Sequence, residues 1–492
     1  MSDAPIRNIV ILGGGTAGWM TAAALSRALA GTGRSVTLVE SDAVGTIGVG
    51  EATIPTIHWF NQIIGLDERA FMAETQATYK LGIQFEGWNG PGTAYMHPFG
   101  TFGAPGDGVM FLHRLIRARL DGAAAATERF SLTAQAARAG RFTHPVGDRR
   151  SLLSTLGYAF HFDATLYAAY LRKRAEAAGV RRVEGMVTRV DRHGANGLVA
   201  ALTLESGARV EGELFIDCSG LRGLLIEDVM QAGFEDWSHW LPCDRAWAAQ
   251  TARDAQVTPY TRSIAMAAGW RWRIPLQHRI GNGYVFSSRF ETEEAARSAF
   301  LAALSEAPIT EPRLIRFQTG RRARSWVGNV VAIGLSSGFL EPLESTSIHL
   351  IQSGIAKLLA LFPRHGHDTL VAEQFNRIFA QEMVDVRDFL ILHYALTQGR
   401  DEPMWKACQA MPIPDSLRYR IDQFRASGRI MLSTDELFRD ASWFAVLDGQ
   451  GVRPSDYNPM IDGESGQQNL AHLEATASAI ARAAASLPAI RS

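Results

Sequence analysis

Two short apolar runs, separated by a glycine-rich turn and an alanine-rich stretch, occupy the first forty residues. The runs at 8–12 (Asn-Ile-Val-Ile-Leu) and 35–40 (Ser-Val-Thr-Leu-Val-Glu) predict buried strands. The stretch at 19–30 favours a helix, because alanine has the highest helix propensity. A helix that crosses between two strands places them parallel in one sheet, so this segment predicts an α/β fold.

Apolar runs farther along the chain extend this prediction. Those at 209–217 and 329–334 predict strands that return to the same sheet from distant positions. Residues 270–288 are typical of β structure, with Gly281-Asn282-Gly283 marking a turn. The sheet is therefore expected to draw its strands from several separate parts of the chain.

Helical spacing of apolar residues dominates from about Ser347 onward. It is clearest at 369–397, and an alanine-rich stretch at 471–487 predicts a last helix. We therefore expect a discontinuous sheet domain over residues 1–360, which includes the β-rich substrate region. A helical C-terminal region over residues 361–492 is expected to cover the substrate pocket.

Composition and charge narrow the class of protein. The 492 residues are 47% hydrophobic and 20% charged, as in a globular enzyme with a large core, and the formal net charge is −1. This balance favours neither nucleic acid nor an anionic membrane as partner. Cys218, Cys243 and Cys408 lie far apart, which argues against a disulfide framework or a metal site and suits a reducing cytoplasm. No apolar leader occupies residues 1–7, and no apolar run reaches the ~18 residues of a membrane helix.

The turn after the first predicted strand fits the pattern GxGxxG. Gly13 allows a tight turn, Gly15 lets the backbone approach a pyrophosphate, and Gly18 permits close packing of helix and strand. Glu40 ends the second predicted strand, where an acid can bind a ribose hydroxyl. The segment predicts a dinucleotide site, and by itself it does not distinguish FAD from NAD.

Longer motifs carry a resemblance to a known family. The glycine turn continues as Gly-Thr-Ala-Gly-Trp-Met, and residues 48–55 read Gly-Val-Gly-Glu-Ala-Thr-Ile-Pro. Residues 270–275 match WxWxIP, and residues 334–346 read Gly-Leu-Ser-Ser-Gly-Phe-Leu-Glu-Pro-Leu-Glu-Ser-Thr. Together with 158–163 and 215–220, these segments resemble the flavin-dependent tryptophan halogenases from about Ile9 to past Tyr394.

The resemblance implies a fold, a cofactor and a reaction. The fold is an FAD-binding Rossmann-type domain of the flavin monooxygenase and halogenase type. A separate flavin reductase supplies reduced FAD, which with dioxygen and chloride or bromide yields hypohalous acid. The acid then halogenates an electron-rich aromatic ring, most often an indole. Members of the family are often dimeric, so a homodimer is expected by analogy.

Lys80 and Glu344 match the catalytic lysine and glutamate of that family. An amine near hypohalous acid can donate a hydrogen bond to it or form a haloamine, and a carboxylate can take the ring proton. Other interpretations exist for both residues. Lys80 shares strand parity with Gln84 and Glu86 and could lie on a wet strand face, and Glu344 could favour the start of a following helix.

The resemblance also assigns binding residues. Those for the cofactor are Gly13, Gly15, Thr16, Ala17, Gly18, Glu40, Glu51, Ala52, Val187, Leu335 and Ile348. Thr346 and Ser347 occupy the halide positions, where backbone N–H groups at a helix start bind the anion. The family usually has glycine in place of Ser347, which leaves the choice between chloride and bromide open.

The predicted substrate residues include a departure from enzymes that act on free tryptophan. His97, Pro98 and Phe99 resemble a pocket segment of the family. Trp443 and Phe444 stand where those enzymes carry a pair of tyrosines that bind the amino-acid head group, and the glutamate position falls near Ser433. A buried ammonium and carboxylate need polar partners. We therefore expect weak use of free tryptophan and better use of indoles that lack its zwitterion, or of indole rings in larger molecules.

Two other functions stay open at this point. A flavin-dependent aromatic monooxygenase on the same fold would usually carry Gly-Asp where this chain has Gly334-Leu335, and would give hydroxylated product. A non-catalytic FAD-binding protein would tolerate the loss of both Lys80 and Glu344. The combination of Lys80, WxWxIP and the Glu-Ser-Thr segment favours the halogenase.

Overall fold

The fold is described from a computed structural model that covers residues 5–43, 50–194 and 196–490. Two compact units emerge from the backbone contacts. The first comprises Met1–Ala77, Phe162–His239 and Phe317–Val384, and the second comprises Thr78–His161, Trp240–Arg316 and Asp385–Ser492. Neither unit coincides with the predicted regions 1–360 and 361–492. The predicted functional division at residue 360 stays a prediction.

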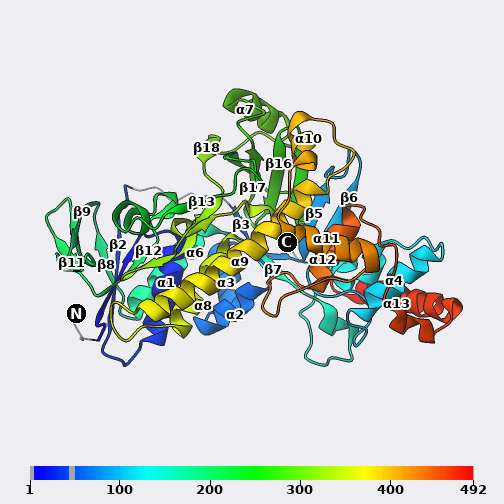
Figure 1. The fold of residues 1–492 in the computed structure, drawn as a ribbon, viewed down its shortest axis with the longest axis horizontal. Helices are drawn as coiled ribbons and strands as arrows, with labels where there is room; N and C mark the ends of the chain where they lie inside the picture. Colours follow the sequence, from blue (N-terminus) through cyan, green and yellow to red (C-terminus); the bar gives the residue numbers. More distant parts are fainter. Residues whose placement is uncertain (1–4, 44–49, 195, 491–492) are drawn as a thin grey trace. The chain divides into compact units, whose positions relative to one another are not determined.

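A six-stranded sheet forms the centre of the first unit (Figure 1). Its strands, in spatial order, are β20 (Trp326–Val327), β21 (Val330–Ala332), β12 (Leu214–Asp217), β1 (Asn8–Leu12), β2 (Ser35–Glu40) and β8 (Arg181–Glu184). All neighbours are parallel except the edge pair of β20 and β21. The predicted parallel arrangement of β1 and β2 is confirmed, with the predicted bounds.

Helix α1 (Thr16–Ala28) crosses between β1 and β2 and packs against α6 (Ala164–Ala177) and α8 (Ser347–Ala360). The remaining elements of this unit are β3 (Gly50–Ala52), α2 (Thr56–Ile63), α3 (Glu68–Thr75), β9 (Val187–Arg192), β10 (Val199–Leu204), β11 (Arg209–Glu211), β13 (Phe234–Asp236), β19 (Gly320–Arg322) and β22 (Gly338–Phe339). Strands β9, β10 and β11 form a separate antiparallel sheet.

The single strand predicted at 209–217 is wrong, because the chain forms two strands there. Strand β11 pairs with β10, and β12 pairs with β1 and β21 in the other sheet. Gly212 lies between them, where a Cβ would come within 2.7 Å of a Val10 methyl carbon. A glycine is therefore needed where the chain passes from one sheet to the other.

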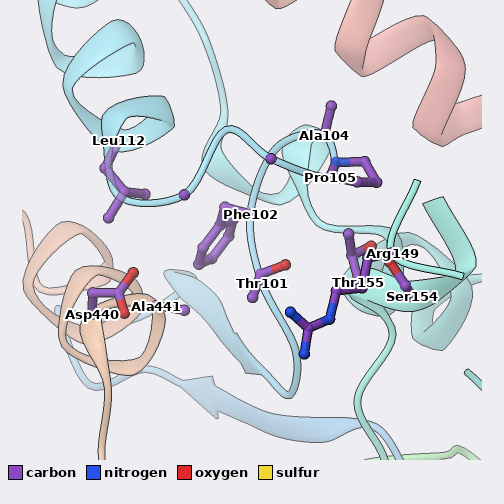
Figure 2. A pocket seen from close by; sticks show the side chains of 12 residues that line it. Thr101, Phe102, Ala104, Pro105, Leu112, Arg149, Ser154, Thr155, Asp440 and Ala441 are labelled. Carbon is purple, nitrogen blue, oxygen red and sulfur yellow. The ribbon is translucent and has the colours of Figure 1, made fainter. Parts of the chain in front are cut away.

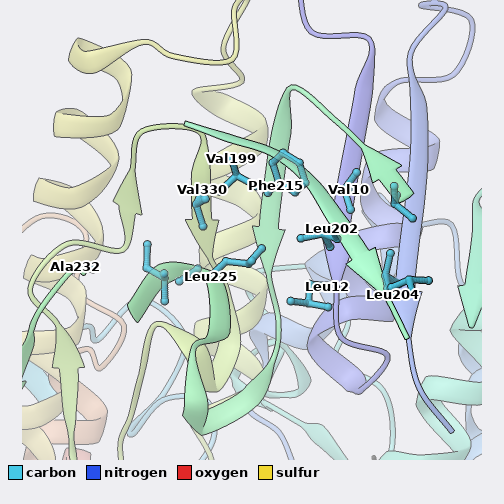
Figure 3. Packing of buried hydrophobic residues seen from close by; sticks show 13 residues of the cluster. Val10, Leu12, Val199, Leu202, Leu204, Phe215, Leu225, Ala232 and Val330 are labelled. Atoms are coloured by element: carbon cyan, nitrogen blue, oxygen red, sulfur yellow. The ribbon is translucent and has the colours of Figure 1, made fainter. Parts of the chain in front are cut away.

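Apolar side chains from the six-stranded sheet and from the sheet of β9, β10 and β11 meet in one core (Figure 3). Val10 and Leu12 from β1, Phe215 from β12 and Leu202 from β10 belong to this cluster and are buried. The alternation of side chains along each strand directs these residues to a shared face. The core thereby fixes β1 and the turn that follows it.

The second unit contains a seven-stranded sheet. Its strands, in spatial order, are β18 (Arg313–Arg316), β14 (Arg245–Ala252), β17 (Arg279–Phe286), β16 (Gly269–Pro275), β15 (Thr261–Met266), β5 (Gly82–Glu86) and β6 (Ala94–Pro98). Its helices are α4 (Met110–Leu120), α5 (Leu132–Arg138), α7 (Glu293–Ala302), α10 (Pro403–Ala410), α11 (Asp415–Ser427), α12 (Asp440–Gly449) and α13 (Gly466–Ser486). Strand β4 (Thr78–Lys80) pairs with β7 (Ala159–Asp163).

The turn predicted at Gly281-Asn282-Gly283 is also wrong. These residues lie inside β17, and the hairpin turn falls at 276–278, between β16 and β17. Gly283 pairs with Trp272, and a Cβ on Gly283 would lie only 2.0 Å from an atom of that indole ring. The absence of a side chain at Gly283 therefore leaves room for the Trp272 indole ring on the neighbouring strand.

The predicted helical C-terminal part is confirmed in outline. Helix α9 (Thr369–Ala395) closely matches the predicted 369–397. Helix α13 begins five residues before the predicted 471, because Ser465 and Gln468 form a capping box that starts it at Gly466. Across the described part of the chain, no helix is long and apolar enough to cross a membrane.

Candidate active site

The glycine turn between β1 and α1 leaves a space bordered by free backbone donors. Gly13 has φ +113°, and a Cβ there would lie 2.3 Å from the carbonyl oxygen of Cys218. A Cβ on Gly18 would lie 1.9 Å from the carbonyl oxygen of Gly13, so these two glycines are required by close backbone contacts. A Cβ on Gly15 would meet nothing within 4 Å. Thr16 and Ala17 begin α1 without a side-chain cap, so their N–H groups and the helix dipole face this space.

Glu40 lies at the edge of the same turn. A Cβ on Gly14 would lie 1.3 Å from Oε2 of Glu40, so the carboxylate is held against the turn. Glu40 accepts a hydrogen bond from the Arg182 guanidinium, and the Arg172 guanidinium lies 3.6 Å from its Oε1. The open space at Gly15, the uncapped helix and this acid together fit the phosphates and a ribose of a dinucleotide such as FAD.

The other predicted cofactor residues belong to the first unit as well. Leu335 follows β21 in a short 3-10 turn, next to Gly334, where a Cβ would lie 2.7 Å from Cβ of Ala17 in α1. Ile348 is buried in the first turn of α8. Val187 starts β9 and packs against the apolar core of the unit.

Glu51 and Ala52 lie in β3, within the predicted segment 48–55, of which Gly48 and Val49 fall outside the described residues. Burial raises the pKa of the Glu51 carboxyl to about 7. A perturbed carboxyl of this kind is typical of a functional site.

The segment before α8 ends in a left-handed turn. Glu344 is fully buried in the 3-10 turn Pro342–Glu344, and Ser345 then adopts φ +60°. Thr346 caps α8 with its backbone, and its buried hydroxyl oxygen has no hydrogen-bond partner within the described residues. Ser347 is the first residue of the helix, which no side chain caps. An orphaned hydroxyl beside uncapped N–H groups fits a bound anion, as the halide prediction requires.

Lys80 is fully buried at the end of β4 in the second unit, so the interpretation as a wet strand face is wrong. Gln84 is buried as well, and Glu86 is only partly exposed. The Lys80 Nζ lies 5.1 Å from the centroid of the Phe99 ring, within the range of a cation–π interaction. The structure thus brings the predicted catalytic residue Lys80 and the predicted substrate residue Phe99 together.

Further aromatic side chains of the second unit lie near Phe99. His97, buried on β6, lies 6.5 Å from Phe99, 5.9 Å from Phe389 and 6.2 Å from Phe438 between ring centroids. Phe389 and Phe438 stack at 3.9 Å. Pro98 lies between His97 and Phe99 and is buried too. The predictions from the sequence missed Phe389, because it is one of many apolar residues on α9.

Trp443 and Phe444 are buried in α12. Trp443 lies 5.1 Å from Phe389, and the Arg420 guanidinium lies 4.9 Å from the centroid of its ring. Its indole N–H has no hydrogen-bond partner among the described residues. Phe444 lies 5.8 Å from Phe102. Trp443 thus belongs to the same aromatic cluster as His97, whereas Phe444 packs against Phe102 and Phe424.

His161 lies beside Lys80 and was not predicted as a site residue, although its segment 158–163 carries part of the resemblance. It is fully buried on β7, opposite Thr78 of β4. Burial, and after it the positive charge of Lys80, holds the pKa of His161 well below the usual range. A neutral imidazole beside Lys80 adds no second charge to this buried site.

The predicted aromatic pair of the WxWxIP segment is confirmed as two side chains on one face. Trp270 and Trp272 are buried on β16, with ring centroids 6.2 Å apart. Arg271 and Arg273 alternate with them along the strand. Burial, followed by the charges of Arg262 and Arg273, lowers the pKa of Arg271 to about 10.

Fold and site together define a nucleotide-binding α/β protein with a buried lysine in an aromatic cluster. The family model for tryptophan halogenase matches residues 8–465. Two solved structures, BrvH from Brevundimonas sp. BAL3 and Xcc4156 from Xanthomonas campestris, are described as flavin-dependent halogenases. Each of them is 45% identical to this chain, and each alignment covers 99% of this chain. BrvH has a TM-score of 0.95 with 98% of its own chain covered, and Xcc4156 has a TM-score of 0.94 with 97% covered. The tryptophan 6-halogenase ThaL of Streptomyces albogriseolus is 36% identical over 93% of this chain and 92% of its own.

The chain therefore belongs to the tryptophan halogenase family and is a flavin-dependent halogenase. The predicted family, fold class, enzyme class and FAD cofactor are confirmed by these matches. The monooxygenase and the non-catalytic FAD-binding protein are not favoured.

Proposed function

We propose that this halogenase acts on the indole ring of molecules other than free tryptophan, with Lys80 and Glu344 as its catalytic residues. The buried apolar side chains of Trp443 and Phe444 carry the proposal, because they pack against aromatic rings and arginine where free-tryptophan enzymes carry tyrosines. These positions offer no hydroxyl to an ammonium or a carboxylate. An ammonium buried there would lose its hydration without gaining an acceptor, because neither side chain carries one.

The first unit supplies the oxidant. A separate flavin reductase delivers reduced FAD. Together with dioxygen and a halide, reduced FAD would supply the hypohalous acid that the reaction consumes. The glycine turn and the uncapped start of α1 bind its phosphates, and Glu40 is placed for a ribose. Thr346 and Ser347 hold the halide with the free donors at the start of α8. By analogy with the family, we further propose a cytoplasmic homodimer.

The second unit directs the halogen. The Lys80 amine donates a hydrogen bond to hypohalous acid, or forms a haloamine, and so presents the halogen to a ring bound beside Phe99. In direct transfer a carbon–halogen bond forms as the oxygen–halogen bond breaks, and hydroxide leaves. Glu344 takes the ring proton, and this proton with hydroxide gives water. In the haloamine route the amine exchanges a proton for the halogen and releases water, and the nitrogen–halogen bond then breaks as the carbon–halogen bond forms, with the ring proton restoring the amine. Because His161 is neutral, it places no further positive charge beside the Lys80 side chain.

The test is halogenation with mass-spectrometric detection. The purified protein would be incubated with FAD, a generic flavin reductase, NADH, oxygen and either indole or tryptophan, with chloride and bromide in separate tubes. We expect a halogen isotope pattern, more product from indole than from tryptophan, and loss of at least about 100-fold in rate for Lys80→Ala. The surface substitution Lys173→Ala is the matched control, because Lys173 is exposed on α6.

Three outcomes contradict parts of the proposal. A product heavier by one oxygen and free of halogen indicates a monooxygenase. Full activity in Lys80→Ala removes Lys80 from the mechanism. More product from tryptophan than from indole overturns the argument from Trp443 and Phe444.

A further inference from the structure

A cavity of about 280 Å³ lies in the second unit beside the aromatic cluster (Figure 2). Its wall is formed by the segment after β6, by α4, by the chain before and within a 3-10 turn at Leu152–Thr155, and by the start of α12. The residues that matter here are Thr101, Phe102, Leu112, Arg149, Thr155 and Asp440. None of these was predicted as a site residue.

The wall of the cavity is close in sequence to the Lys80 site. Phe99, whose ring lies beside the Lys80 amine, precedes Thr101 by two residues, a span of at most about 7 Å. The Thr101 N–H donates to the carbonyl oxygen of Thr155 at 3.2 Å, which closes this segment against the opposite wall. A substituent on a ring bound beside Phe99 would have to span only this short distance from Phe99 to reach the cavity.

Two charged side chains of opposite sign line the cavity, the exposed Arg149 and the partly buried Asp440. Arg149 and Asp440 come from different segments, and within the described residues neither forms an ion pair or a side-chain hydrogen bond. Arg150, the next residue, pairs with Asp148 at 3.1 Å and therefore differs from Arg149. Phe102 and Leu112 are buried and add an apolar wall between polar ends. A guanidinium favours a carboxylate, and a carboxylate favours N–H donors.

The volume of the cavity is larger than one amino-acid head group requires. A water molecule takes about 30 Å³ of liquid, so the cavity has room for about nine waters. The ammonium and carboxylate of one amino acid are much smaller. An amide-linked chain of two or more residues fills this space better and offers both N–H donors and carboxylate or carbonyl acceptors.

We propose that this cavity binds the peptide-like chain of a substrate whose indole ring lies beside Lys80. The preferred substrates are then tryptophan residues within short peptides or similar amides. Arg149 binds a carboxylate or carbonyl of the chain, and Asp440 accepts from its N–H groups. This inference rests on the proposed function, since it assumes that the ring is halogenated beside Lys80.

The experiment compares indole with the peptide Gly-Trp-Gly as substrates of the full-length enzyme with FAD and reductase. In the wild type, we expect kcat/KM for Gly-Trp-Gly to exceed that for free tryptophan about tenfold or more. Arg149→Ala and Asp440→Asn should each lower the ratio of kcat/KM for the peptide over that for indole by about tenfold, mainly through KM. Arg150→Ala is the matched control and should keep the wild-type ratio.

The results separate this inference from the proposed function. Halogenation of indole without halogenation of the peptide, or an unchanged ratio in both cavity variants, overturns the inference and leaves the proposed function standing. Failure to halogenate any of these compounds overturns the proposed function. In that case calorimetric binding of Gly-Trp-Gly decides the inference: tenfold weaker binding by Arg149→Ala supports the cavity, and equal binding overturns it.

Discussion

Lysine side chains are almost never fully buried, and the environment of Lys80 shows how such a residue is accommodated. Phe99 offers the face of its ring, and His161 is held between two hydroxyls. Thr78 donates its hydroxyl proton to the Pro275 carbonyl at 2.7 Å, so His161 Nδ1–H donates to Thr78 at 3.2 Å. Nε2 then accepts from the Thr261 hydroxyl at 2.9 Å. These bonds favour a neutral imidazole with one defined tautomer.

Neutral His161 makes folding sensitive to mild acid. Its pKa is lowered in the folded protein, so below about pH 6.5 the unfolded chain binds a proton that the folded protein does not. The protein therefore keeps its full free energy of unfolding above that pH and loses part of it as the pH falls, because protons bind to His161 in the unfolded chain. His161→Asn should therefore flatten the pH dependence of the unfolding free energy by about 1.4 kcal/mol per pH unit below pH 6.

Urea unfolding between pH 5 and pH 7.5 measures this slope. His193→Asn is the control, because His193 is exposed just after β9, in the connection to β10. Equal slopes for the wild type and His161→Asn would show that His161 titrates alike in the folded and unfolded states, against the burial argument.

At the scale of elements, one carboxylate joins helix α8 to helix α9. His349, Ser353 and Lys357 follow one another at intervals of four residues, so they lie on one face of α8. All three donate to Glu382 of α9, His349 and Lys357 at 2.9 and 2.8 Å. On the other side, His349 Nδ1 lies 3.0 Å from the Thr56 hydroxyl of α2. This network positions the helix whose start carries Thr346 and Ser347.

The network predicts a loss of stability at low pH. Burial alone would raise the pKa of Glu382, but the hydrogen bonds and charges of His349 and Lys357 outweigh it and lower the pKa to about 2. A lowered pKa stabilises the fold above about pH 4.5, and this stabilisation is lost as the pH falls toward 2. Glu382→Gln should lower the unfolding free energy at pH 7 by about 3 kcal/mol.

Denaturant titrations at pH 7 and at pH 3 measure this difference, which should shrink at the lower pH. Glu373→Gln on the exposed face of the same helix should stay close to the wild type at both values. A loss of similar size at both pH values would assign the effect of Glu382→Gln to packing instead of charge.

Local patterns predicted the elements whose cause is local. The bounds of β1 and β2 and the length of α9 follow from apolar periodicity in one segment. The turn at Gly281–Gly283 failed because the reason for Gly283 is Trp272 on another strand. Within the site, the predicted positions of Lys80 and Glu344 came from motifs, whereas Phe389 and His161 join the cluster through contacts between distant segments. The polar stripe on α8 is visible in the sequence, but its partner Glu382 is not.

At the scale of the whole molecule, the predicted functions divide between the two units. Every predicted cofactor and halide residue, together with Glu344, belongs to the first unit, and Lys80 with the predicted substrate residues belongs to the second. Each unit has its own hydrophobic core. A substitution that removes cofactor binding should therefore leave the binding of an aromatic substrate intact.

Gly15→Ala tests this division with little risk to the fold. The backbone of Gly15 has φ −75°, which any residue adopts, and a Cβ would meet nothing within 4 Å. If the open space is where the pyrophosphate binds, the added methyl group should raise the Kd for FAD about tenfold or more. Thermal stability without FAD and the Kd for indole, measured by tryptophan fluorescence, should stay near the wild-type values. Gly463→Ala, also free of contacts within 4 Å, is the matched control for FAD binding. Unchanged FAD affinity in Gly15→Ala would place the pyrophosphate elsewhere, and a parallel loss of indole binding would show that the two units do not bind independently.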